Sequence, residues 1–181
     1  KSYISISIAG SHGKTSTSTF LSTLLELCTH NSSSITGGII PIYNSNAHIE
    51  NTKFLVTEID ESDGTITKYN PNIGIINNID FDHCDHFNNI DELLSSFKQF
   101  ASNSKKLLIN YDCEITRNNF TSKNQWSNRQ TNNIAYSIIP EDINNKNTVG
   151  KYYENGIFID VITIPVPGLH NLSNITAAIA A

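Results

Sequence analysis

The sequence predicts an α/β domain with a mainly parallel, P-loop-type sheet covered by helices on both faces, plus a smaller antiparallel hairpin portion in the C-terminal half. Two observations lead to this prediction. Short apolar runs of strand length alternate with longer segments whose apolar residues recur every three or four positions, as in helices. A glycine-bearing loop, GSHGKT, joins the first such strand to the first such helix. With 181 residues, the chain is long enough for one domain with its own core.

The first strand is predicted over residues 3–9, where Tyr and Ile alternate with Ser before the chain becomes apolar. A helix is predicted over residues 15–29, because the apolar side chains of this segment fall on one helical face. The Ser-rich segment that follows is interpreted as a loop, which leads to Gly37, Gly38 and a short apolar run broken by Pro41.

Two further apolar runs, residues 54–59 and 73–79, have the length of buried strands. Residues 90–101 predict an amphipathic helix, and residues 107–111 predict another strand. Alternation of this kind implies parallel strands joined by crossover connections. The carboxyl ends of the strands should therefore share one edge of the sheet.

The pattern weakens after the last of these strands. An apolar island at residues 134–139 indicates a short strand between surface loops. Residues 149–153 and 157–165 predict a hairpin that turns near residues 155–156, because Asn-Gly is a strong hairpin signal. A last helix is predicted to open around residues 171–174.

Composition excludes several classes of partner. A net charge of −5 and an isoelectric point near 5.6 provide no basic surface for nucleic acid or for an anionic membrane. No apolar run approaches the roughly 18 residues of a membrane span, and the N-terminal residues lack the pattern of a signal peptide. The three cysteines have no metal-ligand spacing. We therefore expect reduced thiols and a cytoplasmic location.

The strongest functional signal is the loop between the first strand and the first helix. Backbone N–H groups in such a loop, with the positive end of the helix dipole, form a cradle for phosphate. Lys14 is expected to reach the β- and γ-phosphates of ATP, and the Thr15 hydroxyl to bind Mg²⁺. The match is G-x-x-G-K-T only, because Ile8 stands where the longer common pattern has its first glycine. The predicted nucleotide-binding residues of the loop are Gly10, Ser11, His12, Gly13, Lys14, Thr15 and Ser16.

Acidic side chains follow the strand predicted over residues 54–59. Four carboxylates occur within six residues: Glu58, Asp60, Glu61 and Asp63. Ligands bind at the carboxyl ends of parallel strands. An acid that faces a phosphate loop there can hold Mg²⁺, directly or through water. The alternative is an ordinary acidic loop.

Polar residues also follow the strand predicted over residues 73–79, namely Asp80, Asp82, His83, Asp85 and His86. The spacing lacks the paired cysteines or the helical His-x-x-x-His that would favour zinc. A single imidazole beside a second Mg²⁺ fits this pattern better. A polar loop without a ligand is the alternative.

Two amides, Asn171 and Asn174, lie one helical turn apart in the last predicted helix. A carboxamide can both donate to and accept from the edge of an adenine base. Helix capping by Asn171 or Ser173 is the alternative, and the spacing alone favours capping.

Together, these four blocks resemble the central ATP-binding domain of the Mur ligase family, which builds the peptide stem of bacterial peptidoglycan. The resemblance extends from Ile8 to the last residue. Within the family, His12 in GSHGKT resembles both the ligases that join L-alanine to UDP-N-acetylmuramate and the muropeptide-recycling ligases, whereas Ser62 in EIDESD resembles the alanine-adding ligases. The Asn77-Asn78 pair departs from the Thr-Asn that is usual there, so the muropeptide-recycling ligases are the alternative within the family.

The resemblance implies roles for individual residues. Lys14, Glu58 and His83 would be catalytic: Lys14 would stabilise charge on the γ-phosphate, Thr15 and Glu58 would bind one Mg²⁺, and His83 would bind the second. Asn171 and Asn174 would contact the nucleotide base.

Other positions would face the UDP-muramoyl substrate, namely Gly37, Gly38 and Asn46. Some family members also use a carbamylated lysine about fifteen residues after the histidine. Lys98 stands at that distance, but its frame in the sequence favours exposure to solvent.

The resemblance further implies that residues 1–181 form one central domain, with the UDP-binding N-terminal domain and the C-terminal domain absent. Such a fragment is expected to bind Mg-ATP weakly and to make no amide bond. Two other classes are considered. The first is a different P-loop enzyme, such as a small GTPase or a kinase; a GTPase would need an Asn-Lys-x-Asp string, which the chain lacks. A non-catalytic nucleotide-binding module is the remaining alternative.

Overall fold

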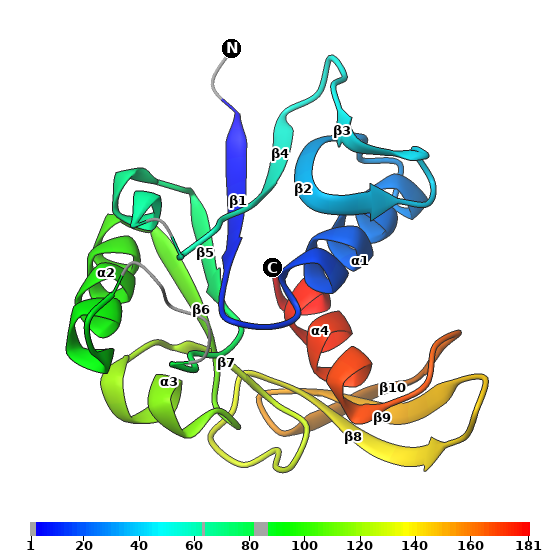
Figure 1. Ribbon diagram of the computed structural model, residues 1–181. Coiled ribbons are helices and arrows are strands. Elements are labelled where there is room, and N and C mark those ends of the chain that lie inside the picture. Colours follow the sequence, from blue (N-terminus) through cyan, green and yellow to red (C-terminus); the bar gives the residue numbers. More distant parts are fainter. Residues whose placement is uncertain (1–2, 63, 82–86) are drawn as a thin grey trace.

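The structure is a computed structural model that describes residues 3–62, 64–81 and 87–181 (Figure 1). Its strands are β1 (Ile4–Ala9), β2 (Ser32–Ile40), β3 (Ser45–His48), β4 (Phe54–Glu58), β5 (Ile73–Ile76), β6 (Lys106–Asn110), β7 (Asn124–Ser127), β8 (Tyr136–Ile143), β9 (Thr148–Glu154) and β10 (Ile157–Ile164). Its helices are α1 (Lys14–Leu27), α2 (Ile90–Asn103), α3 (Glu114–Asn119), α4 (Leu169–Ala180) and the short 3₁₀ helix η1 (Thr65–Lys68).

Within these residues, one sheet runs in the order β10-β9-β8-β7-β6-β5-β1-β4-β2-β3. The strands from β8 to β2 in this order pair in parallel. At one end β9 and β10 are antiparallel, and at the other end β3 is antiparallel to β2. The predicted fold class, a mainly parallel sheet with an antiparallel portion in the C-terminal half, is therefore confirmed. The antiparallel β3 is an addition that the sequence pattern does not indicate.

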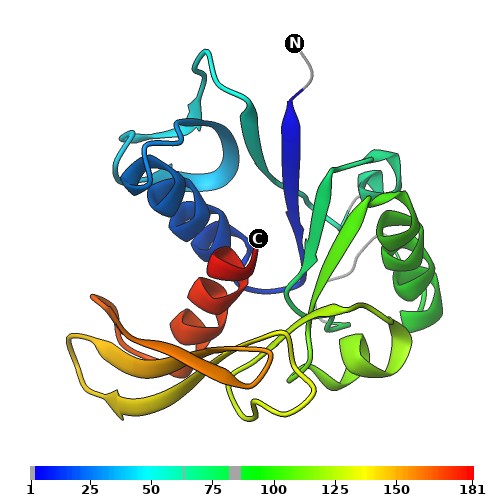
Figure 2. The same cartoon turned by 180° about the vertical axis from the view of Figure 1, so that it is seen from behind.

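The helices lie on both faces of the sheet, as Figures 1 and 2 show from opposite sides. Helices α1 and α4 pack against each other on one face. Helix α2, with η1 and α3, covers the other face. Among the described residues, every helix is too short or too polar to cross a bilayer.

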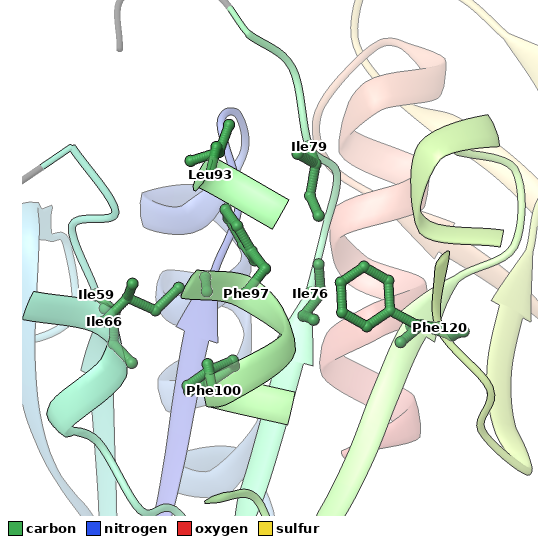
Figure 3. Close-up of a cluster of buried hydrophobic side chains, with 10 residues drawn as sticks. Ile59, Ile66, Ile76, Ile79, Leu93, Phe97, Phe100 and Phe120 are labelled. Carbon is green, nitrogen blue, oxygen red and sulfur yellow. The ribbon is translucent and has the colours of Figure 1, made fainter. Parts of the chain in front are cut away.

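A hydrophobic core lies on each face of the sheet, and successive residues of the central strands pack alternately into one core and the other. Ile8 and Ile75 pack on the α1 and α4 side, whereas Ala9 and Ile76 pack on the α2 side. Figure 3 shows the core on the α2 side, in which aromatic rings from α2 lie over the sheet beside Ile76 and Phe120. This alternation follows from the two-residue period of a strand that is buried on both faces.

The predicted Ser-rich loop is wrong, because this segment belongs to β2. Ser32 and Ser34 are fully buried, and Ser34 is hydrogen-bonded to Ser22 of α1 at 2.9 Å and to Ser32 at 3.4 Å. Because these hydroxyls satisfy one another, they can stand in a buried strand where apolar side chains would be expected. Apolar periodicity alone does not reveal such a strand.

The C-terminal hairpin forms as predicted. Asn155 and Gly156, with φ angles of 50° and 80°, make the turn between β9 and β10. Consecutive left-handed residues of this kind match the twist of paired strands.

The sequence pattern does not reveal α3 or β7. The latter has one buried apolar side chain, Trp126, and its end is held by Asp112, which accepts hydrogen bonds from Ser127 Oγ at 2.6 Å and from the next backbone N–H at 2.7 Å.

Removal of the Phe97 ring should strongly destabilise the fold. Phe97 is fully buried between α2 and the sheet, so Phe97→Ala should lower the free energy of unfolding by about 3–5 kcal/mol. Phe158→Ala is the matched control, because that ring is 50% exposed, and it should cost less than about 1 kcal/mol. Urea unfolding followed by circular dichroism measures both values. Equal losses in the two variants would contradict the packing described above.

Candidate functional site

The site is built around the loop that joins β1 to α1 (blue in Figure 1). Strand β1 ends at Ala9 and α1 begins at Lys14, so GSHGKT connects a strand to a helix N-terminus, as predicted. The N-cap residue of α1 is Gly13, with φ of 78°. The first backbone hydrogen bond of the helix runs from Thr17 N to Gly13 O at 2.9 Å. The N–H groups of the first turn therefore lie at the helix N-terminus, where an anion can accept from them.

The end of β5 braces this loop. Asn78 accepts from His12 N at 2.7 Å and donates to His12 O at 3.0 Å, while Asn77 donates to the Thr17 hydroxyl at 2.9 Å. The Ser11 hydroxyl donates to the carbonyl of Asp80 at 3.0 Å. Strand β5 ends at Ile76, before the predicted residue 79, because the following residues turn to make these contacts. The loop is thus held by the residues that directly follow the neighbouring strand β5.

Lys14 is paired with an acid in the segment that follows β4. Its Nζ donates to both carboxylate oxygens of Glu61, at 2.9 and 3.2 Å, and to the carbonyl of Gly10 at 2.7 Å. The two side chains are only 16% and 10% exposed. The pair lies at the carboxyl end of the sheet, where the sequence places the acidic residues beside the phosphate loop.

Thr15 faces a second carboxylate. Its hydroxyl lies 2.9 and 3.0 Å from the two carboxylate oxygens of Glu58, and Gly37 N donates to the same carboxylate at 2.7 Å. The predicted partners Thr15 and Glu58 thus meet, although they are 43 residues apart in sequence. Gly38 packs on Thr15 so closely that a Cβ on Gly38 would lie 2.8 Å from the Thr15 methyl carbon.

The Thr15–Glu58 pair fits the ligand preferences of magnesium. Mg²⁺ prefers oxygen ligands and usually keeps water and phosphate oxygens beside one or two protein groups. A hydroxyl and a carboxylate within hydrogen-bond distance suit this preference. In the part of the chain that the structure describes, no three His, Cys, Asp or Glu side chains gather as a larger metal cluster. The predicted ligand His83 lies outside the described residues, as do Asp63, Asp82, Asp85 and His86.

A hollow of about 480 Å³ opens beside the loop, toward α4. Asn174 lines it and lies against the loop, since a Cβ on Gly13 would be 2.4 Å from Asn174 Oδ1. Asn171 instead donates to the carbonyl of Pro167 at 2.7 Å. The N-cap of α4 is Gly168, without a side-chain cap, so neither Asn171 nor Ser173 caps this helix. The residues that line the hollow are His12, Gly13, Ser16, Asn77, Asn78, Asn110, His170, Ser173 and Asn174.

A second hollow of about 440 Å³ shares Asn110, His170 and Ser173 with the first and extends toward Arg129 and Pro140. The two hollows therefore adjoin, and together they are called the groove below. Both volumes lie in the usual range for small-molecule sites.

Lys98 lies elsewhere. It is exposed and lines a separate hollow with Lys105, Lys106 and Lys123, beside the first residues of β6 and β7. The β1–α1 loop lies at the opposite edge of the sheet, where β1 ends. This placement agrees with the expectation that Lys98 faces solvent.

The family model described as the Mur ligase middle domain matches residues 8–181. The chain belongs to the Mur ligase family. A UDP-N-acetylmuramate–L-alanine ligase from Prochlorococcus marinus subsp. pastoris is 82% identical over 180 residues, which are 99% of this chain and 38% of that protein. The chain thus spans about two fifths of the length of the curated relatives it matches.

Solved structures share the fold. One match is the crystal structure of the UDP-N-acetylmuramate–alanine ligase MurC from Thermotoga maritima, with a TM-score of 0.85 at 23% identity. The match covers 99% of this chain and 40% of the MurC chain. The match to the MurF ligase from Thermotoga maritima in complex with ADP has a TM-score of 0.70 at 17% identity. It covers 98% of this chain and 44% of the MurF chain. At such identities the likeness shows the Mur ligase fold alone.

His170, Ser173 and Asn110 line the site without a ligand role predicted from the sequence. His170 and Ser173 share one face of α4 with Asn174, for which a base contact is predicted, and this helical spacing is the signal that could have identified them. Asn110 ends a parallel strand, as Glu58 does. Glu61 was one acid among four, and only the structure shows that it is the partner of Lys14.

Gly13 and Gly156 provide a matched test of this geometry, because their φ angles are 78° and 80°. Gly156→Ala should cost about 1–2 kcal/mol of stability, the strain of a left-handed alanine, since its Cβ would meet nothing closer than 3.7 Å. Gly13→Ala should cost about 1–3 kcal/mol more, because its Cβ would overlap Asn174. Chemical unfolding measures both, and adding Asn174→Ala should recover part of the excess. Equal costs would refute the contact with α4.

Proposed function

We propose that this chain is the ATP-binding part of a ligase that joins L-alanine to UDP-N-acetylmuramate in peptidoglycan precursor synthesis. The observation that carries the proposal is the convergence of Lys14 and Thr15 with Glu61 and Glu58 at a strand–loop–helix turn. Family membership and the 82% identical relative support this proposal over a generic nucleotide-binding module.

In this proposal the triphosphate of ATP lies along residues 10–16, where backbone N–H groups at the α1 N-terminus and Lys14 neutralise its charge. The adenosine occupies the adjoining hollow, where Asn174 contacts its base. The family resemblance gives Asn171 the same role, but its side chain donates to the carbonyl of Pro167 and does not line this hollow. Mg²⁺, held by Thr15 and Glu58 and at a second position by His83, would supply further positive charge to the phosphate oxygens.

The chemistry requires an activated acid, because a carboxylate is a poor acyl donor. The substrate carboxylate oxygen attacks the γ-phosphorus of ATP, the bond to the β-phosphate oxygen breaks, and ADP leaves. The amine of L-alanine then attacks the acyl phosphate carbon, a C–N bond forms, and phosphate leaves with the proton passing to solvent. Carboxylate and triphosphate are both anions, so the main task of this chain is to position them and to neutralise charge through Lys14.

We further propose that residues 1–181 are one domain of a longer enzyme. The groups that hold the UDP-sugar and the amine would belong to the domains beyond this chain, with Gly37, Gly38 and Asn46 facing the UDP-muramoyl substrate. The isolated chain should then bind Mg-ATP weakly and make no amide bond, since positioning of the reactants can supply about 7–11 kcal/mol of the barrier.

The muropeptide-recycling ligases are the second candidate, because of Asn77-Asn78. In this chain Asn77 donates to Thr17 and is 2% exposed, so the departure from Thr-Asn is a packing feature of the loop. An assay of the longer protein with UDP-N-acetylmuramate and ATP, with either L-alanine or a murein tripeptide, separates the two. Phosphate release and product formed only with the tripeptide would favour recycling, and no product with either would refute both.

Lys14→Met should weaken Mg-ATP binding to the isolated chain at least about 30-fold, because it removes the cation that is expected to reach the β- and γ-phosphates. Lys98→Met removes an exposed lysine outside the site and should leave the affinity unchanged. Isothermal titration calorimetry measures both variants. Unchanged affinity in Lys14→Met would show that the phosphate-loop assignment is wrong.

A further inference from the structure

The ammonium group of Lys14 has its hydrogen-bonding capacity filled within the chain. It has three N–H donors, and the structure gives it three acceptor oxygens: Glu61 Oε2 at 2.9 Å, Glu61 Oε1 at 3.2 Å and Gly10 O at 2.7 Å. Glu61 itself is a buried carboxylate, only 7% exposed, and Lys14 is its ion-pair partner. Contact between Lys14 and a triphosphate therefore requires an exchange of partners.

We propose that Glu61 is an internal competitor of the nucleotide, which holds Lys14 until phosphate oxygens displace it. The proposal rests on the proposed function, since it concerns the same phosphate loop. Glu61 acts through Lys14 and is therefore a positioning residue, distinct from Glu58, which contacts Thr15 and Gly37 instead.

The physical reason is that two anions compete for one buried cation. Because the exchange leaves a carboxylate without its partner, the cost of that exchange is subtracted from the binding free energy of the ligand. The contacts of a ligand with a single weak negative charge offset little of this cost. A triphosphate also accepts hydrogen bonds from the backbone N–H groups at the α1 N-terminus, and these contacts offset more of it. The pair should therefore reduce binding of small anions and favour nucleotides.

A different role for Glu61 predicts the opposite sign. If Glu61 moved onto the metal ion once Lys14 was released, its removal would weaken binding of the magnesium complex. The internal competitor predicts tighter binding, with or without metal. The direction of the change in affinity therefore separates the two roles.

The experiment uses the chain as it stands, with ADP in EDTA and Mg-ATP as the two probes, titrated by calorimetry. Glu61→Gln should bind both probes about three- to tenfold more tightly than the unsubstituted chain, since a partly buried ion pair no longer opposes them. Asp60→Asn is the matched control, because Asp60 is a neighbouring exposed acid whose carboxylate accepts only from Ser62 N among the contacts described, and it should change neither affinity.

Stability measurements keep the test informative if affinity and folding change together. Without nucleotide, Glu61→Gln should lower the melting temperature, and the double variant Lys14→Met with Glu61→Gln should lose less than the sum of the single losses. A purely structural role for Glu61 would also lower the melting temperature but would not tighten nucleotide binding. Glu61→Asp, whose shorter side chain reaches Lys14 less well, should show a smaller gain in affinity and serves if Glu61→Gln does not fold.

Three outcomes would overturn the inference: unchanged affinity in Glu61→Gln, weaker binding of both probes, or weaker binding of Mg-ATP alone. The last of these would assign Glu61 to the metal. Failure of the unsubstituted chain to bind either probe would instead refute the proposed function, so the two failures are distinguishable.

Discussion

The turn from β1 into α1 depends on polar side chains that reach it from three other parts of the chain. Asn78 holds both backbone groups of His12, Glu61 holds Lys14, and Asn174 lies against Gly13. A loop with glycines at such positions has little intrinsic preference for one shape. Its shape therefore comes from its neighbours, and its ability to receive phosphate depends on packing that involves most of the domain.

The parallel register is what brings these neighbours to the loop. In the β1–β4 pair Ile8 stands beside Glu58, and in the β1–β5 pair Ala9 stands beside Ile76. The chain leaves all three strands at the same edge of the sheet within a few residues. The two hydrophobic cores on either side hold the strands in this register, because a shift by one residue would exchange the faces of every side chain.

Most of the parallel sheet and the existence of the loop could be predicted from sequence, because both rest on local patterns. The family resemblance pairs Thr15 with Glu58, but the residues themselves do not predict which acid binds Lys14. Nothing in EIDESD distinguishes the acid that meets Lys14 from the acid that meets Thr15, since that depends on how the chain turns after β4. The buried serines of β2 and the polar strand β7 were missed for a related reason. They are stabilised by hydrogen bonds to distant residues, which have no periodic signature.

Trp126, the single tryptophan of the chain, is 1% exposed, and its indole N–H donates to the Ser173 hydroxyl at 3.2 Å. Ser173 lies on α4 and lines both hollows of the groove. The one strong indole fluorophore is thus one hydrogen bond away from the groove while its ring lies in the core between α4 and the sheet. The chain contains its own optical reporter: the same emission band senses both the integrity of this core and events at the wall of the groove, without an attached dye.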